Sequence, residues 1–340
     1  MRATRRTFLK TAGAAGMAAL AGDLLRGEAS AAESVPSKTT SPQGTARGLT
    51  LCTIKRGDRL TLGVRTPKGV LDVERAASAE GVRFPLTPDD VIHGKNLDGL
   101  RKVLGRTGKG RKSFLLKEDE FTFGPCVTNP QKIIMMGFNY RKHCNELKIP
   151  IPTLPVFFNK YNNALLGHGG TIRLPTGVAK NFDYEVELVV VLGKTARDVS
   201  VEDALSHVAG YCTGNDFTAR DLQFKTTQYM VGKTCDGFAP IGPWLVGADL
   251  VGDPQKLKLE CRVNGEVRQS SNTDDMIFSC ANLVSYASSV MTLEPGDIIF
   301  TGTPEGVIQG KPEAQRVWLK AGDKLSTEIE KPGDLRFSLV

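Results

Sequence analysis

The chain has few of the residues that form the most recognisable metal and redox motifs. Among its 340 residues are four histidines and seven cysteines, and successive cysteines are at least 18 residues apart. That spacing excludes a Cys-x-x-Cys zinc or redox motif, and the odd number leaves at least one thiol unpaired. We expect most of these cysteines to be small buried core residues rather than members of a disulfide framework.

Long apolar runs and heptad repeats are also missing, which argues against membrane spans and a coiled coil. Hydrophobic residues make up 40% of the chain and charged residues 24%. This hydrophobic content is enough to bury a core and is too high for a mainly disordered chain. The formal charge is +7, and the one basic run, residues 101–112, is interleaved with glycine rather than aromatic residues. Because stacking platforms for bases are missing there, we interpret the run as a solvated loop and expect no nucleic-acid partner.

The first 31 residues have the order of regions typical of a twin-arginine export signal. Arg5 and Arg6 are followed by a short, weakly apolar stretch over 11–22 and then by Ala29-Ser30-Ala31, which fits a cleavage site. The apolar stretch is shorter than the about 20 residues of a membrane span, so we expect no stable membrane association. We predict a twin-arginine (Tat) signal over 1–31, recognition by the Tat export machinery, and a periplasmic or exported protein; with a non-functional leader, the protein is cytoplasmic.

The composition of the remaining chain divides it into three parts. Residues 32–48 are rich in Ser, Thr and Pro and are predicted to form a flexible linker. Residues 49–126 show short alternating strands around Gly turns, which predicts a small N-terminal β-rich domain. Residues 130–340 carry longer strand-like runs and polar clusters, and are predicted to form the larger domain.

Strands outnumber helices in the larger domain, and the two do not alternate along the chain. The expected fold class is therefore α+β, mainly β. Asn264-Gly265 between two apolar runs predicts a type I′ hairpin turn. The expected strands are 132–136, 184–192, 210–213, 257–263, 297–300 and 324–329, and the expected helices are 140–147, 201–209 with Ser200 as N-cap, and 282–289.

Three acidic residues are candidates for a metal site. Glu185 and Glu187 are two apart in a strand-like run, so their side chains lie on one face about 6.6 Å apart. Two buried carboxylates on one face repel each other, and a bound cation relieves that repulsion. Asp216 follows another strand-like run and supplies a third acid, and oxygen ligands alone favour Mg²⁺, Mn²⁺ or Ca²⁺ over zinc. The alternative is that the start of the strand protrudes into water.

One histidine is placed for proton transfer. His143 and Glu146 are three residues apart in a predicted helix, and therefore lie on one face. A carboxylate beside an imidazole raises its basicity and fixes its tautomer, which suits activation of a water molecule. A surface i,i+3 pair is the alternative that spacing alone leaves open.

The chain resembles a known family in an ordered set of short motifs from about Lys132 to the C-terminus, with a looser similarity from Leu49. Each motif alone is weak, but their order and spacing are specific. The motifs are Gly137-Phe138-Asn139-Tyr140 with His143 and Glu146, Tyr184-Glu185-Val186-Glu187, Asn215-Asp216 with Ala219-Arg220-Asp221 and Gln223, Gly232-Lys233, Pro240-Ile241-Gly242-Pro243-Trp244, Val263-Asn264-Gly265-Glu266, Thr292-Leu293-Glu294-Pro295-Gly296-Asp297 and Thr301-Gly302-Thr303-Pro304-Glu305-Gly306-Val307. In these motifs the sequence is similar to the fumarylacetoacetate hydrolase (FAH) superfamily.

The resemblance implies a mixed β-roll or β-sandwich catalytic domain that is usually a homodimer. It implies a divalent cation, Mg²⁺ first and Mn²⁺ or Ca²⁺ as alternatives, held by Glu185, Glu187 and Asp216. It also implies a water-activating pair on a loop or short helix that closes over the substrate. By the same resemblance, the catalytic residues are His143, Glu146 and Lys233, and the substrate-binding residues are Arg220, Gln223 and Thr303.

The implied reaction is hydrolysis of a carbon–carbon bond in a 2,4-dioxo acid such as an acylpyruvate or fumarylpyruvate. The cation acts as a Lewis acid that stabilises the released enolate, while the His–Glu pair activates the attacking water. Because other members use the same site differently, the alternative is a decarboxylase or isomerase of diacids such as oxaloacetate or 2-hydroxyhepta-2,4-diene-1,7-dioate. An alternative of another class is a non-catalytic protein that binds oxo acids through the metal.

Overall fold

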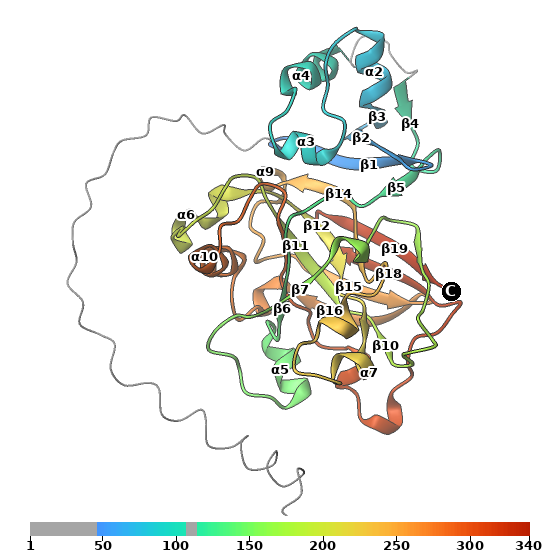
Figure 1. Ribbon diagram of the computed structural model, residues 1–340, viewed down its shortest axis with the longest axis vertical. Helices are drawn as coiled ribbons and strands as arrows, with labels where there is room; N and C mark the ends of the chain where they lie inside the picture. The colour runs from blue at the N-terminus through green and yellow to red at the C-terminus, as the bar shows by residue number, and fades with distance from the viewer. Residues whose placement is uncertain (1–45, 107–113) are drawn as a thin grey trace, which may run out of the picture. The chain divides into compact units, whose positions relative to one another are not determined.

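The computed structural model describes residues 46–106 and 114–340 (Figure 1). The predicted Tat signal, residues 1–31, and the predicted linker up to residue 45 lie outside the described residues. Within the described ranges, none of the helices combines the length and apolar character that a membrane crossing needs.

A twelve-stranded mixed sheet forms the framework of the fold. Its strands are β1 (Thr50–Arg56), β2 (Arg59–Thr66), β3 (Gly69–Asp72), β4 (Leu115–Leu116), β5 (Thr122–Gly124), β6 (Ile133–Gly137), β7 (Val156–Lys160), β8 (Leu165–Leu166), β11 (Val186–Leu192), β12 (Val208–Asn215), β14 (Ala239–Gly247) and β17 (Ile298–Phe300). They follow the order β4-β3-β2-β1-β14-β12-β11-β17-β6-β7, with β5 beside β1 and β8 beside β14. The pairs β17–β6 and β14–β8 are parallel.

A second sheet packs on the large one and completes a β-sandwich. Its five strands, in spatial order, are β16 (Glu266–Asn272), β15 (Lys258–Val263), β18 (Lys324–Ile329), β19 (Gly333–Leu339) and β9 (Gly170–Ile172). Leu259 and Phe337 of this sheet share one apolar cluster with Leu188 and Val190 of the large sheet. A short pair, β10 (Phe182–Asp183) with β13 (Thr218–Ala219), stands apart. The predicted fold class, mainly β with a sandwich architecture, is confirmed.

Strand β11 lies in the middle of the fold and is buried on both faces. Alternate side chains, among them Val186 and Leu188, join the cluster between the two sheets. Val189 and Val191 point the other way into a second apolar cluster. All seven residues of β11 are buried. The period of two in a strand explains why its side chains enter two different clusters.

The N-terminal strands are part of the same large sheet. Strand β1 pairs with β14, with Thr50 opposite Val246, and β2 and β3 extend the sheet beyond it. Helices pack on these strands through a shared apolar cluster. They are α2 (Val73–Ala79), α3 (Pro88–Ile92) and α4 (Leu97–Arg106), labelled in Figure 1. The division between the predicted domains 49–126 and 130–340 stays a prediction.

The structure corrects the interpretation of the basic run. Arg101 and Lys102 lie in α4, not in a loop, because Leu100 and Val103 of the same helix are buried in the apolar cluster. Both basic side chains are exposed, so they are solvated as expected. Residues 107–112 of the run lie outside the described residues.

The helices of the larger part are few and short. They are α5 (Arg141–Leu147), α6 (Val201–Ala204), α7 (Arg220–Gln223), α8 (Met230–Lys233), α9 (Ala248–Val251) and α10 (Cys280–Val290), with 3₁₀ turns η2 (Asn162–Ala164), η3 (Leu205–His207), η4 (Thr273–Asp275), η5 (Ile308–Gly310) and η6 (Glu313–Gln315). Helices α5 and α10 confirm two predictions, and Ser200 caps α6 as expected. The predicted end of that helix at Ala209 is wrong, because Val208 already pairs with Leu192 in the sheet.

Two local predictions are confirmed as well. Asn264 and Gly265 connect β15 and β16 with φ angles of 53° and 86°, as a type I′ turn requires. All seven cysteines are free thiols, and six of them are buried.

Asn139 anchors the start of α5 to two distant segments. Its side-chain Nδ2 donates to the carbonyl oxygens of Phe278 at 3.0 Å and Thr301 at 2.7 Å. Its Oδ1 accepts a 2.9 Å hydrogen bond from the Phe278 N–H. The side chain is fully buried, so water cannot replace these bonds.

We expect Asn139→Ala to destabilise the protein by about 2–4 kcal/mol, because each buried group left without a partner costs about 1–3 kcal/mol. Urea unfolding followed by circular dichroism measures the change. Asn145→Ala is the matched control, since Asn145 is exposed on α5 and should shift stability by less than about 0.5 kcal/mol. Equal stability of the two variants contradicts the anchoring role.

Candidate metal and active site

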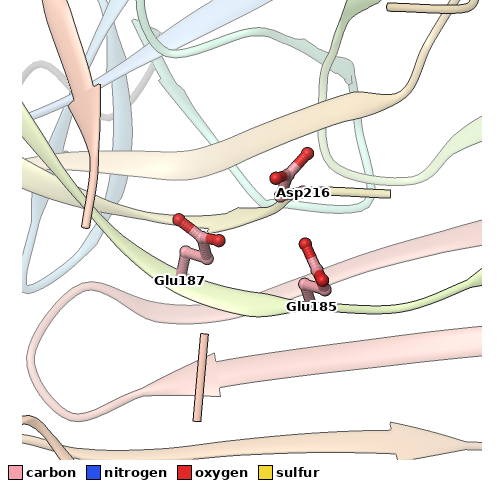
Figure 2. Close-up of side chains that lie close together, drawn as sticks. All are labelled: Glu185, Glu187 and Asp216. Atoms are coloured by element: carbon pink, nitrogen blue, oxygen red, sulfur yellow. The ribbon is translucent and has the colours of Figure 1, made fainter. Parts of the chain in front are cut away.

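Three acidic side chains converge where β11 begins and β12 ends. Glu185 lies one residue before β11, Glu187 is the second residue of that strand, and Asp216 directly follows β12. The strands are antiparallel, with Val186 opposite Asn215, and the Asp216 N–H donates a 2.9 Å hydrogen bond to the Glu185 carbonyl. The pairing brings the acids together (Figure 2), with one oxygen of each within 4.8 Å of the others.

All three carboxylates are buried. The exposed fractions are 5% for Glu185 and 1% each for Glu187 and Asp216. The alternative that the start of the strand protrudes into water is therefore excluded. Carboxylates in such a setting need counter-charges or a bound cation.

Buried cations compensate two of the acids. Arg220 Nη2 lies 2.6 Å from Glu185 Oε1, and Lys233 Nζ lies 2.5 Å from Glu185 Oε2. Lys233 Nζ is also 2.7 Å from Asp216 Oδ2, while Lys160 Nζ is 2.5 Å from Asp216 Oδ1. Glu185 and Asp216 therefore each have cations at both oxygens.

Glu187 lacks such compensation. Within the described part of the chain its carboxylate forms no ion pair, and Oε2 accepts a 2.8 Å hydrogen bond from the Gly302 N–H. Burial raises the pKa of Glu187, and the negative charges of Asp216 and Glu185 raise it further. Burial also raises the pKa of Glu185, but two neighbouring cations outweigh it and lower this pKa to about 2.

A divalent cation fits this donor set. Together with Asp183, which pairs with Arg220 at 2.9 Å, four buried carboxylates face three buried cations, so one negative charge is uncompensated. Asp216 Oδ1 also receives no hydrogen bond of ordinary geometry within the described residues. Three carboxylate ligands suit Mg²⁺, Mn²⁺ or Ca²⁺. The residues placed to hold such an ion are Glu185, Glu187 and Asp216.

The predicted proton-transfer pair lies in the adjacent cavity. His143 Nδ1 is 3.1 Å from Glu146 Oε2, one turn apart on α5. His143 is only 5% exposed and borders the cavity, which excludes the alternative of a surface pair. Because Nδ1 faces the carboxylate, Nε2 is the ring nitrogen left for proton exchange.

The loop before and within η5 holds Glu146 in place. The Gly306 N–H donates a 2.9 Å hydrogen bond to Glu146 Oε1, and the Tyr184 hydroxyl donates one of the same length to the Gly306 carbonyl. Gly310 lies directly against the carboxyl group, because a Cβ at this position is 2.2 Å from Glu146 Cδ. The Glu146 carboxyl group therefore fits against the loop only because residue 310 is a glycine and has no side chain.

The cavity of about 230 Å³ brings the predicted site residues together. Eight of the nine border it, and Glu146 is the exception, since it contacts His143 from behind. Most of the remaining wall is apolar or aromatic, with Gln309 as a polar member; the apolar and aromatic residues are Met136, Phe138, Leu147, Ile149, Phe158, Phe224, Tyr229 and Val307. The volume is below the about 300–1,000 Å³ of pockets for drug-sized ligands, which indicates a small substrate.

The three predicted substrate-binding residues also contact protein groups. Arg220 Nη1 donates to Gln223 Oε1 at 3.1 Å, and the other guanidinium nitrogens contact acids. Thr303 Oγ1 accepts a 2.9 Å hydrogen bond from Gln269 Nε2. The functional roles of the nine site residues stay predictions.

Two site residues escaped the sequence interpretation. Asp183 accepts hydrogen bonds from the Ile308 and Gln309 N–H groups at 2.9 and 3.0 Å, and also pairs with Arg220. Lys160 contacts Asp216 from β7. Asp183 adjoins the Glu185 motif and was a visible candidate, whereas an isolated lysine at a strand end carries no sequence signal.

We expect Gly310→Ala to separate Glu146 from His143, because the new methyl group occupies the space of the carboxyl group. The ¹⁵N signal of His143 Nδ1 should lose its hydrogen-bond shift, and with four histidines in the chain the spectrum is simple to assign. The control is Gly105→Ala, on α4 with open space around it. An unchanged His143 signal in Gly310→Ala contradicts the prediction.

Comparisons with known proteins identify a family for the chain. The family model described as "Fumarylacetoacetate (FAA) hydrolase C-terminal" matches residues 132–340. The Bos taurus protein "Oxaloacetate tautomerase FAHD2A, mitochondrial" is 46% identical over 222 residues, which are 64% of this chain and 69% of that protein.

Solved structures show the same architecture. The fumarylacetoacetate hydrolase from Exiguobacterium antarcticum has a TM-score of 0.71 and 32% identity, covering 86% of this chain and 99% of its own. The fumarylpyruvate hydrolase from Pseudomonas aeruginosa, in complex with Mn²⁺ and pyruvate, has a TM-score of 0.57 and 35% identity, covering 64% and 91%. Since the family model covers more than half of the sequence, this chain belongs to the fumarylacetoacetate hydrolase family.

Proposed function

We propose that this chain is a divalent-cation-dependent enzyme that interconverts the enol and keto forms of a small 2-oxo diacid such as oxaloacetate. The observation that carries the proposal is that the buried His143, paired with Glu146, borders the same small cavity as the acidic cluster. Relatives named oxaloacetate tautomerase, 42–46% identical to this chain, support the choice of substrate.

The roles of the residues follow from their positions. When bound by Glu185, Glu187 and Asp216, a divalent cation supplies a Lewis acid that favours negative charge on the substrate's oxo oxygen. His143 Nε2 exchanges the proton on the carbon next to the oxo group, while Glu146 fixes the imidazole through Nδ1. The proton on the enol oxygen leaves as the carbon gains one, so the net reaction is a proton shift.

The same pair favours a second candidate, hydrolysis of a carbon–carbon bond. A base that takes a proton from carbon also takes one from water, and the activated water then attacks a 2,4-dioxo acid such as an acylpyruvate. The neighbour named fumarylpyruvate hydrolase, in complex with Mn²⁺ and pyruvate, supports this candidate. Decarboxylation of oxaloacetate needs no such pair, so the geometry favours it less.

The test follows the ultraviolet absorbance of enol-oxaloacetate with full-length protein that was stripped by chelator and then given Mg²⁺ or Mn²⁺. We expect loss of the enol to be faster than with the metal alone, with keto-oxaloacetate as the product by NMR. A parallel assay with a short acylpyruvate reports pyruvate plus a carboxylic acid if hydrolysis is the function. Absence of turnover in both assays, with oxo-acid binding retained, indicates a binding protein and contradicts the proposal.

In whichever of the two assays shows turnover, we expect His143→Ala to lower kcat by about 10²–10⁴-fold, the usual contribution of a general base. Mn²⁺ affinity should change little, because His143 is not among the three acids. His93→Ala is the matched control, since His93 is exposed and does not border the cavity. Unchanged turnover in His143→Ala contradicts the role of the pair in either reaction.

We expect Glu187→Gln to weaken Mn²⁺ binding by at least about 100-fold. Loss of a residue that only orients a metal ligand already costs about 10–100-fold in affinity, and Glu187 is predicted to be a ligand itself. The metal-free variant should be as stable as the metal-free parent or more stable, since it removes an uncompensated buried charge. Titration calorimetry and thermal unfolding measure the two effects. Glu266→Gln is the control, because that side chain is 67% exposed.

Export through the Tat machinery and a homodimer remain predictions of the sequence. Secretion of a fusion of residues 1–31 to a reporter tests the first, and sedimentation equilibrium of the full chain tests the second.

A further inference from the structure

Lys160, the last residue of β7, is a buried cation that the proposed reaction does not use. Its side chain is 0% exposed, and Nζ lies 2.5 Å from Asp216 Oδ1. Lys160 does not border the cavity, so it has no access to a substrate there. Its effect on the site therefore passes through Asp216.

Two backbone carbonyls fix the position of this ammonium group. Lys160 Nζ donates to the Phe217 carbonyl at 3.0 Å and also to the Phe238 carbonyl. The rings of these two phenylalanines pack edge to face with centroids 4.8 Å apart, and both residues are fully buried. The contact with Asp216 Oδ1 is an ion pair, made by the positive charge of an ammonium group that the two carbonyls hold in place.

Lys233 contacts the other oxygen of the same carboxylate in a different setting. It borders the cavity, and its Nζ lies 2.7 Å from Asp216 Oδ2 and 2.5 Å from Glu185 Oε2. In the described structure no backbone carbonyl accepts a hydrogen bond from this group. Lys233 is thus held by the predicted metal ligands Glu185 and Asp216. Lys160 is held in addition by two backbone carbonyls that are not metal ligands.

We propose that Lys160 is a positioning residue that fixes the Asp216 carboxylate for cation binding, an inference that rests on the divalent-cation site of the proposed function. By holding Oδ1, Lys160 directs Oδ2 towards Lys233 and the cavity that Lys233 borders. A bound cation would compete with Lys233 for Glu185 and Asp216, whereas Lys160 would keep its contact with Asp216. The two lysines therefore have different functions at one carboxylate.

The direction of the mutational effect distinguishes positioning from simple electrostatics. Lys160 is positive and close to the cation site, so its charge alone opposes the binding of a divalent cation. If charge were its whole effect, removal of the ammonium would strengthen Mn²⁺ binding. If Lys160 positions Asp216, removal weakens binding, because the carboxylate loses its fixed orientation.

The experiment titrates chelator-stripped full-length protein with Mn²⁺ and follows free Mn²⁺ by electron paramagnetic resonance. We expect Lys160→Met to weaken the affinity by about 10–100-fold, the range for partners that orient metal ligands. Lys160→Gln should act in the same direction, and its amide still donates to the buried carbonyls if the Met variant fails to fold. Circular dichroism of the metal-free proteins confirms folding.

The control is Lys132→Met, which breaks a similar lysine–aspartate pair at a distance from the site, where Nζ lies 2.9 Å from Asp297. We expect Mn²⁺ affinity to be unchanged in this variant. In an Asp216→Asn background, Lys160→Gln should have no further effect, because its action passes through the lost carboxylate.

Unchanged or tighter Mn²⁺ binding in both Lys160 variants overturns the positioning role and leaves the cation site intact. An equal loss of affinity in Lys132→Met also overturns it, since general destabilisation then explains the effect. Failure of the parent protein to bind Mn²⁺ overturns the cation site and, with it, this inference.

Discussion

Burial of like charges is the constraint on which this structure depends. Glu185, Glu187 and Asp216 lie in an apolar interior, where isolated carboxylates strongly destabilise a fold. Each must therefore meet a cation, a hydrogen-bond donor or a metal ion. The surrounding elements are arranged to supply these partners: Arg220 begins one short helix, Lys233 ends another, and a backbone N–H comes from the loop after β17. Many of the groups around the cavity therefore stabilise buried carboxylates whose negative charge exceeds that of the neighbouring cations by one.

That support is indirect at several points. Asp183 does not belong to the acidic cluster, yet it fixes Arg220 and, through two backbone N–H groups, the η5 turn that lies against Glu146. The acid cluster and the predicted proton-transfer pair are thus linked through Asp183, Arg220 and the η5 turn that lies against Glu146.

The sequence predicted the parts of the site that depend on local periodicity. Glu185 and Glu187 share a face because strands repeat every two residues, and His143 meets Glu146 because helices bring residues three apart together. It did not predict Lys160, because the contact with Asp216 depends on where β7 lies in the sheet. Helices α2–α4 were missed for a similar reason, since the strands they cover determine which of their apolar residues are buried. Contacts of tertiary origin leave little trace in local sequence.

The pairing of β1 with β14 affects how the chain folds. Thr50 and Val246 are neighbours in the sheet although nearly two hundred positions separate them in sequence. Such long-range pairing forms slowly, because a large loop must close before any hydrogen bond is gained. Until it forms, the end of β14 at Leu245 and Val246 lacks its β1 partner and is open to other chains. The N-terminal strands therefore cover this edge of the sheet, and the edge stays exposed until β1 docks, which favours aggregation during folding.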